Sequence, residues 1–122
     1  MEVQFLNLKK AYSELQPSFE DLWKEVNAKA HYILGERVKT FQQEFAEYLG
    51  VKHVIGVANG LDALVLSLQA LGIKRDDEVI VPSHTFIATW LAVSEVGAIP
   101  VPCEVDEKTY LIDPAKIESL IT

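Results

Sequence analysis

The stretch over residues 54–71 constrains the fold of this chain more than any other. It reads VIGVANGLDALVLSLQAL. The β-branched residues Val54, Ile55 and Val57 favour a short strand, whereas the leucines that follow recur at helical spacing. The spacing of the apolar residues changes from that of a strand to that of a helix across Asn59 and Gly60. The stretch therefore predicts a strand, a tight turn and a helix.

The turn at Asn59 and Gly60 is a candidate anion site. The first backbone N–H groups of a helix have no partner within the helix and carry partial positive charge, so they can bind a phosphate without a dedicated cation. Gly60 would let a ligand approach the backbone closely. Asn59 is also a favourable N-cap, so the residues alone leave open whether the turn binds a ligand or only begins a helix.

Composition excludes several classes of partner. The chain has 122 residues, 49% of them hydrophobic, and a net charge of -7. This balance argues against a nucleic-acid or anionic-membrane partner. The single cysteine, Cys103, favours a reducing cytoplasm and a buried, unreactive thiol, and the scattered histidines predict no metal site. We expect a protein that is neither exported nor inserted in a membrane.

The remaining helices and strands are predicted from the spacing of apolar residues, from helix-capping residues, and from the glycines and prolines that end an element. Residues 1–16 show no sustained period and predict an arm, and Ser18 with Asp21 resembles a capping box that begins a helix at residues 18–30. Further helices are expected from Glu36 to Gly50, from the Gly60 turn to Gly72, over residues 87–96, and from Pro114 to Leu120. Further strands are expected at residues 79–81 and 99–105.

Three strands that alternate with helices predict an α/β fold with a mostly parallel sheet and flanking helices. Ligands bind beyond the carboxyl ends of such strands, which here are residues 59–61 and 83–86. Pro100 and Pro102 have no backbone N–H group, so the last strand has fewer donors for hydrogen bonds to a neighbouring strand. Because three strands are few for this architecture, we expect the chain to be a fragment.

Seven short motifs together resemble one family. In chain order they are FLNLK at 5–9, ILG with FQQEFA at 33–46, GVANGLDAL at 56–64, DEVIVP at 77–82, TFIAT at 85–89, GAIPV at 97–101 and YLIDP at 110–114. Each is weak alone, but their order and spacing resemble the DegT/DnrJ/EryC1/StrS family of pyridoxal-phosphate-dependent sugar aminotransferases. The resemblance runs the length of the chain, and Asp76 departs from the glycine that is common in that surface turn.

This resemblance implies the N-terminal part of a fold-type I transferase. Residues 1–35 would form an arm and first helix, and residues 36–122 the first part of the large domain that binds pyridoxal 5'-phosphate. By analogy with the family, Asn59, Gly60 and Leu61 would hold the cofactor phosphate, and Phe86 would stack on the pyridine ring. The residues alone favour a core role for Phe86, since an aromatic at a helix start usually packs in the core, so the stacking role rests on the resemblance.

The reaction that the resemblance implies moves an amino group from glutamate to a nucleotide-linked keto-sugar, in a cytoplasmic protein that is a homodimer at full length. The family's Schiff-base lysine lies C-terminal to residue 122, and no lysine of this chain lies in that motif. We therefore assign no catalytic residue and expect this chain alone to be inactive. Two alternatives remain open: a dehydratase of the same family with histidine at the lysine position, and a non-catalytic α/β module.

Overall fold

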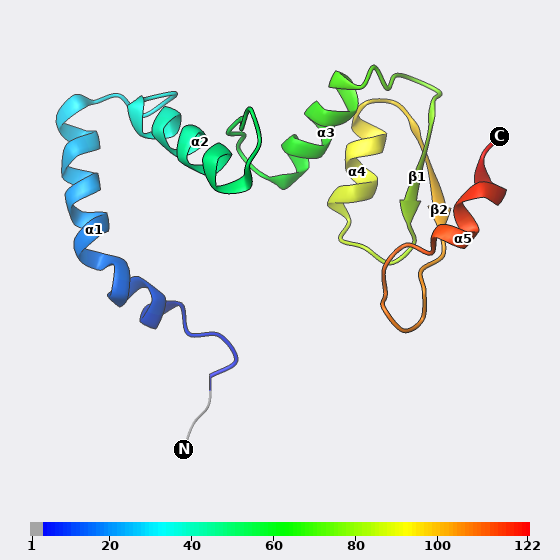
Figure 1. Cartoon of the computed structure of the whole chain (residues 1–122), viewed down its shortest axis with the longest axis horizontal. Helices are drawn as coiled ribbons and strands as arrows, with labels where there is room; N and C mark the ends of the chain where they lie inside the picture. Colours follow the sequence, from blue (N-terminus) through cyan, green and yellow to red (C-terminus); the bar gives the residue numbers. More distant parts are fainter. Residues whose placement is uncertain (1–3) are drawn as a thin grey trace. The chain divides into compact units, whose positions relative to one another are not determined.

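The computed structural model describes residues 4–122 (Figure 1). The chain divides into two compact units, Met1–Gly56 and Val57–Thr122, which are described separately. Residues 1–3 of the expected arm lie outside the described part.

The first helix of the first unit is much longer than predicted. Helix α1 spans Leu8–Lys29, and the side chain of Asn7 caps it by accepting a hydrogen bond from the N–H of Lys10 at 3.1 Å. The predicted arm over 1–16 and the capping box at Ser18 are therefore wrong beyond residue 7. Pro17 suggested a helix start, but it lies inside α1.

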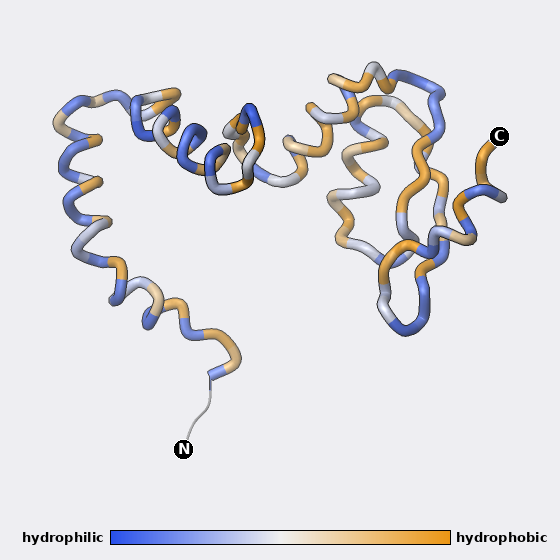
Figure 2. Tube along the Cα trace, viewed as in Figure 1, coloured by the Kyte–Doolittle hydropathy of each residue, from blue (hydrophilic) through white to orange (hydrophobic). Residues whose placement is uncertain are grey.

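Helix α2 spans Glu36–Leu49, as the sequence predicts. Gly50 ends it in the left-handed conformation, with a φ of 67°, which is the conformation that glycine adopts without strain. Phe41, Phe45 and Tyr48 lie on one side, where successive ring centroids are 5.4 and 6.0 Å apart. The helix is amphipathic, and polar and apolar residues alternate along it in Figure 2.

An ion-pair cluster connects the end of α1 to the start of α2. The carboxylate of Glu25 contacts the guanidinium of Arg37 and lies 2.8 Å from the ammonium of Lys29. Hydrogen bonds from Arg37 and then Lys29 lower the pKa of Glu25 to about 2. Since the side chains of this cluster remain partly accessible to solvent, water and salt screen the ion pairs, and we expect their contribution to stability to be small.

The strand predicted at residues 54–57 is not formed. These residues have no regular secondary structure, and the side chain of Ile55 is 78% exposed. Apolar, β-branched residues favour a strand, but a strand forms only where a neighbour accepts its hydrogen bonds. Within residues 4–122, no segment pairs with this one.

The second unit is built on a parallel strand pair. In chain order its elements are α3 (Gly60–Ala70), β1 (Glu78–Pro82), α4 (Ala88–Glu95), β2 (Ile99–Cys103), α5 (Pro114–Ile117) and the short 3₁₀ helix η1 (Glu118–Leu120). Strand β1 pairs with β2 in parallel, with Glu78 opposite Ile99 and Pro82 opposite Cys103. The parallel sheet is confirmed, with two strands in place of the predicted three.

The prolines of β2 face away from β1. The N–H of Ile99 donates to the carbonyl of Asp77 at 2.8 Å, so residues 99, 101 and 103 point their N–H groups toward β1. Pro100 and Pro102 alternate with them and therefore occupy the other edge, where no ladder donor is lost to the β1 pairing. This explains how a strand with two prolines forms.

A small core holds the second unit together. Val81 from β1, Val93 from α4 and Ala98 before β2 are buried, and half-buried apolar side chains, including Leu68 and Trp90, pack around them. Helix α4 contacts both strands and α3 packs against α4. Figure 2 shows the strands and these helices as mostly apolar. Among residues 4–122, no helix is long and apolar enough to cross a membrane.

Candidate functional site

Asn59 begins helix α3 with a reciprocal side-chain contact. Its backbone is extended, its Oδ1 atom accepts a hydrogen bond from the N–H of Asp62 at 2.9 Å, and its Nδ2 donates to the Asp62 carboxylate at 3.2 Å. The carbonyl of Asn59 accepts from the N–H of Ala63 at 3.1 Å. Two of the first four N–H groups of α3 are therefore satisfied by Asn59.

The other two N–H groups, those of Gly60 and Leu61, are open. Neither donates to another backbone or side-chain group within residues 4–122. A Cβ atom on Gly60 would meet no described atom within 4 Å, and the φ of Gly60 lies outside the left-handed region. Neither crowding nor backbone conformation therefore requires glycine here, and the open space beside it can admit a ligand.

Phe86 lies in the segment that leads from β1 into α4. Its ring is 77% exposed, so in this chain it is not a core residue. The backbone carbonyl of Phe86 accepts from the N–H of Thr89 at 3.0 Å, which places Phe86 at the start of the helical turn. An exposed aromatic face at this point can stack on a flat ligand.

These features border one open hollow of about 570 Å³, which we name the Gly60–Phe86 hollow. It is lined by Asn59, Gly60, Leu61, Leu64, Phe86, Ile87, Ala88, Thr89 and Leu91. The structure thus brings together all of the site residues that the sequence singled out, although their role in binding stays a prediction. The apolar lining residues Leu64, Ile87 and Leu91 were missed, because side chains of this type at helical spacing usually indicate packing.

Asp62 in the first turn of α3 and His84 after β1 do not line the hollow. The carboxylate of Asp62 accepts a hydrogen bond from the side chain of Asn59. The ring centroid of His84 lies 5.8 Å from that of Tyr110, with the rings tilted by 51°. Among residues 4–122, no group of three or more His, Cys, Asp or Glu side chains could hold a metal ion.

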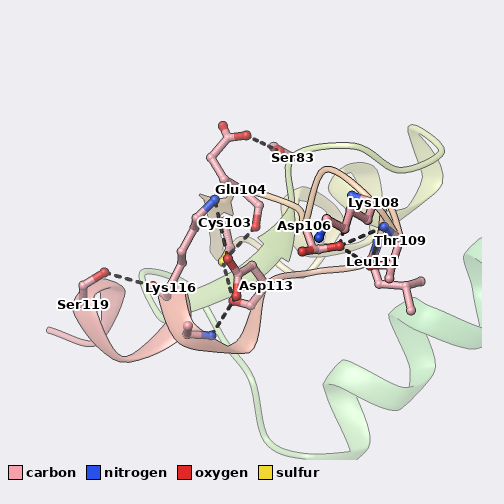
Figure 3. A network of polar contacts seen from close by, with 11 residues as sticks. Ser83, Cys103, Glu104, Asp106, Lys108, Thr109, Leu111, Asp113, Lys116 and Ser119 are labelled. Atoms are coloured by element: carbon pink, nitrogen blue, oxygen red, sulfur yellow. Dashed lines mark hydrogen bonds and ion pairs between the residues drawn. The ribbon is translucent and has the colours of Figure 1, made fainter.

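A polar loop that contains Asp106, Lys108 and Thr109 follows β2 (Figure 3). The carboxylate of Asp106 accepts from the N–H and the hydroxyl of Thr109 and from the N–H of Lys108, at 2.8, 3.0 and 3.1 Å. These hydrogen bonds, led by those of Thr109, hold the pKa of Asp106 below its usual range. This carboxylate therefore closes the turn at residues 106–109.

Cys103, at the end of β2, is fully buried. Its Sγ atom lies 3.7 Å from the carbonyl oxygen of Glu104 and 3.8 Å from that of Asp113 (Figure 3). The expectation of a buried thiol is therefore confirmed.

The hollow fits an anionic group joined to a flat ring. The free N–H groups at the start of α3 suit a phosphate, and an exposed phenyl ring borders the same space. Pyridoxal 5'-phosphate has both parts. The fit rests on donors that have no protein partner among the described residues and on open space where a side chain at position 60 would project.

Comparison with known proteins gives one consistent family. The profile of the DegT/DnrJ/EryC1/StrS aminotransferase family matches residues 14–122. The chain is 49% identical to "Erythromycin biosynthesis sensory transduction protein EryC1" of Saccharopolyspora erythraea, over 100% of this chain and 33% of that protein. It is 48% identical to "dTDP-3-amino-3,4,6-trideoxy-alpha-D-glucose transaminase" of Streptomyces venezuelae, over 98% of this chain and 32% of that protein.

The fold agrees with that of solved members. The crystal structure of NtdA from Bacillus subtilis with bound cofactor PMP superposes with a TM-score of 0.94 at 32% identity, over 99% of this chain and 28% of that one. The expected fold, the first part of a fold-type I transferase with a parallel sheet and flanking helices, is therefore confirmed. The chain spans about a third of the length of the curated relatives it matches.

Proposed function

Because the chain belongs to the DegT/DnrJ/EryC1/StrS aminotransferase family, we propose that it is the N-terminal, cofactor-binding part of a pyridoxal-phosphate-dependent aminotransferase. In this proposal the whole protein moves an amino group from glutamate to a keto-sugar that is linked to a nucleotide. The printed name of the Streptomyces venezuelae relative, a transaminase of a dTDP-linked amino sugar, supports this class of substrate.

The observation that carries the proposal is the pair of open N–H groups at Gly60 and Leu61, two residues that line the same hollow as the exposed Phe86. In the proposed complex these N–H groups donate to the phosphate, and the dipole of α3 favours its negative charge. Asn59 takes up the next two N–H groups, so the phosphate meets only the free donors. Phe86 lies against the pyridine ring and fixes its tilt.

When it is bound, pyridoxal 5'-phosphate supplies an electron sink for the carbon that loses or gains the amino group. The residues of this chain bind and orient it. None of them is assigned a proton transfer, because no lysine here lies in the family's lysine motif. A homodimeric, cytoplasmic whole protein is part of the same proposal.

A second candidate is a cofactor-binding protein without catalysis. It is favoured by the printed name of the Saccharopolyspora erythraea relative, which describes a sensory transduction protein. A dehydratase of the family is the nearest enzymatic alternative, and the residue at the family's lysine position distinguishes it from an aminotransferase.

An absorbance titration of the whole protein with pyridoxal 5'-phosphate, followed by borohydride reduction and peptide mapping, tests these candidates. For an aminotransferase we expect a saturable change in the cofactor spectrum and covalent fixation on one lysine. A dehydratase or a non-catalytic binder would show saturable binding without fixation on a single lysine. Scattered labelling with no saturation would contradict the cofactor assignment altogether.

A further inference from the structure

The ring of Phe86 is held by its backbone and not by packing. With 77% of the residue exposed, few neighbours restrict the ring directly. The backbone carbonyl of Phe86 accepts from the N–H of Thr89 at 3.0 Å. The hydroxyl of Thr85, the residue before Phe86, forms a hydrogen bond with the hydroxyl of Thr89 at 3.0 Å. Thr89 thus contacts both Thr85, through its hydroxyl, and Phe86, through its backbone N–H.

Helix α4 does not depend on this hydroxyl pair to begin. Its formal N-cap, Ile87, is already in the helical conformation, and no side chain caps the helix there. The N–H groups of Trp90 and Leu91 both donate to the carbonyl of Ile87, at 3.1 and 3.0 Å. The Thr85–Thr89 contact is therefore separate from the backbone hydrogen bonds that begin the helix, and it joins the residue before Phe86 to the first turn of α4.

We propose that Thr85 is a positioning residue that aims the ring of Phe86 at the Gly60–Phe86 hollow through its hydroxyl contact with Thr89. This rests on the proposed function, in which that ring lies against the pyridine of the cofactor. Without the contact the exposed ring occupies several orientations, and the bound cofactor must select one of them, which weakens binding. Thr85 itself does not line the hollow, whereas its partner Thr89 does, so the test separates an effect that passes through the ring of Phe86 from one that passes through Thr89 alone.

The test uses the whole protein and a double-mutant cycle. Thr85→Val removes the hydroxyl at nearly constant shape, Thr85→Ser keeps it, and Phe86→Ala removes the ring. Ser94→Ala is the matched control, because its hydroxyl bonds the Trp90 carbonyl on the same helix at 3.2 Å and does not line the hollow. The readouts are the dissociation constant for pyridoxal 5'-phosphate and the visible circular dichroism of the bound cofactor, which reports the tilt of its ring.

We expect Thr85→Val to raise the dissociation constant about 3- to 10-fold, the usual effect of one lost hydrogen bond, and to reduce the dichroic band. Thr85→Ser and Ser94→Ala should both match the parent protein. In the Phe86→Ala background, Thr85→Val should have no further effect, because the ring that it positions is gone.

Two results would overturn the inference. One is a Thr85→Val variant with the parent affinity and dichroism, whatever its free energy of unfolding. The other is an equal loss of affinity in the Phe86→Ala background, since Thr85 would then act without the ring. If Phe86→Ala weakens binding and Thr85→Val does not, only this inference fails. If the parent protein binds no cofactor, the proposed function fails and this inference fails with it.

Discussion

The Oδ1 atom of Asn59 and the backbone N–H of Asp62 form a 2.9 Å hydrogen bond that divides the start of helix α3 into two parts. Asn59 also accepts the next N–H, that of Ala63, through its carbonyl, whereas the N–H groups of Gly60 and Leu61 have no partner among residues 4–122. The cap and the candidate phosphate site therefore use different donors of one helix and do not compete.

Replacing the cap should change stability. We expect Asn59→Ala to lower the free energy of unfolding by about 1 kcal/mol, since the N–H of Asp62 loses its acceptor. Asn59→Ser restores an oxygen at the cap and should recover most of this loss. Urea denaturation monitored by circular dichroism measures both. Equal stabilities for the alanine and serine variants would show that the side-chain cap contributes nothing.

Position 60 should affect binding far more than folding. A β-branched residue, as in Gly60→Val, directs its side chain into the hollow beside the free N–H groups, and we expect it to weaken binding of pyridoxal 5'-phosphate about 10-fold or more. Binding of pyridoxal, which lacks the phosphate, should change much less. Fluorescence titration of both ligands measures the difference, and an unchanged affinity for the phosphorylated form would count against the site.

Gly97 provides the matched control for Gly60. Its φ is +80°, a conformation that strains any residue with a side chain, whereas the φ of Gly60 lies outside this left-handed region. Gly97→Val should therefore lower the free energy of unfolding by about 1 kcal/mol or more and leave cofactor affinity in the folded fraction unchanged. The opposite pattern, a stable Gly97 variant and an unfolded Gly60 variant, would contradict the assigned roles.

The Glu25 cluster predicts a pH dependence. Because its hydrogen bonds with Arg37 and Lys29 lower the pKa of Glu25 to about 2, the folded state binds a proton less readily than the unfolded chain, whose carboxyl has a pKa of about 4.3. The contribution of this cluster to stability is therefore complete above the unfolded pKa and is lost as the pH falls toward the folded pKa. Carboxyl-detected NMR titration should show Arg37→Ala raising the pKa of Glu25. An unchanged value would exclude Arg37 as the main cause.

The thiol of Cys103 should be inert. It is fully buried between two carbonyl oxygens, so we expect Ellman's reagent to modify it only when the second unit opens. The rate should rise to that of an ordinary thiol in denaturant. Fast modification of the native protein would show that the end of β2 is accessible.

Helix ends were predicted correctly where a capping residue in the sequence marks them. Asn59 and Gly50 mark where α3 begins and α2 ends, because capping is decided by neighbouring residues. The expected strand ends drew attention to residues 59–61 and 83–86, and the resemblance to the family singled out Asn59, Gly60, Leu61 and Phe86 within them. Their role in binding stays a prediction.

The errors have two physical causes. Leu8, Tyr12, Leu15, Phe19 and Leu22 recur at helical spacing, but Pro17 interrupts this pattern and obscured a helix that continues through the proline. Val54, Ile55 and Val57 have the preference for a strand, yet a strand also needs a neighbour, and local preference cannot supply one. The reciprocal contact of Asn59 with Asp62 and the Thr85–Thr89 pair depend on geometry that only the structure provides.

The position of the phosphate in a crystal structure of the whole protein with pyridoxal 5'-phosphate tests the central claim most directly. We predict phosphate oxygens within about 2.7–3.2 Å of the backbone nitrogens of Gly60 and Leu61, with the ring of Phe86 against the pyridine. A phosphate bound elsewhere, with these N–H groups facing only solvent, would contradict the account.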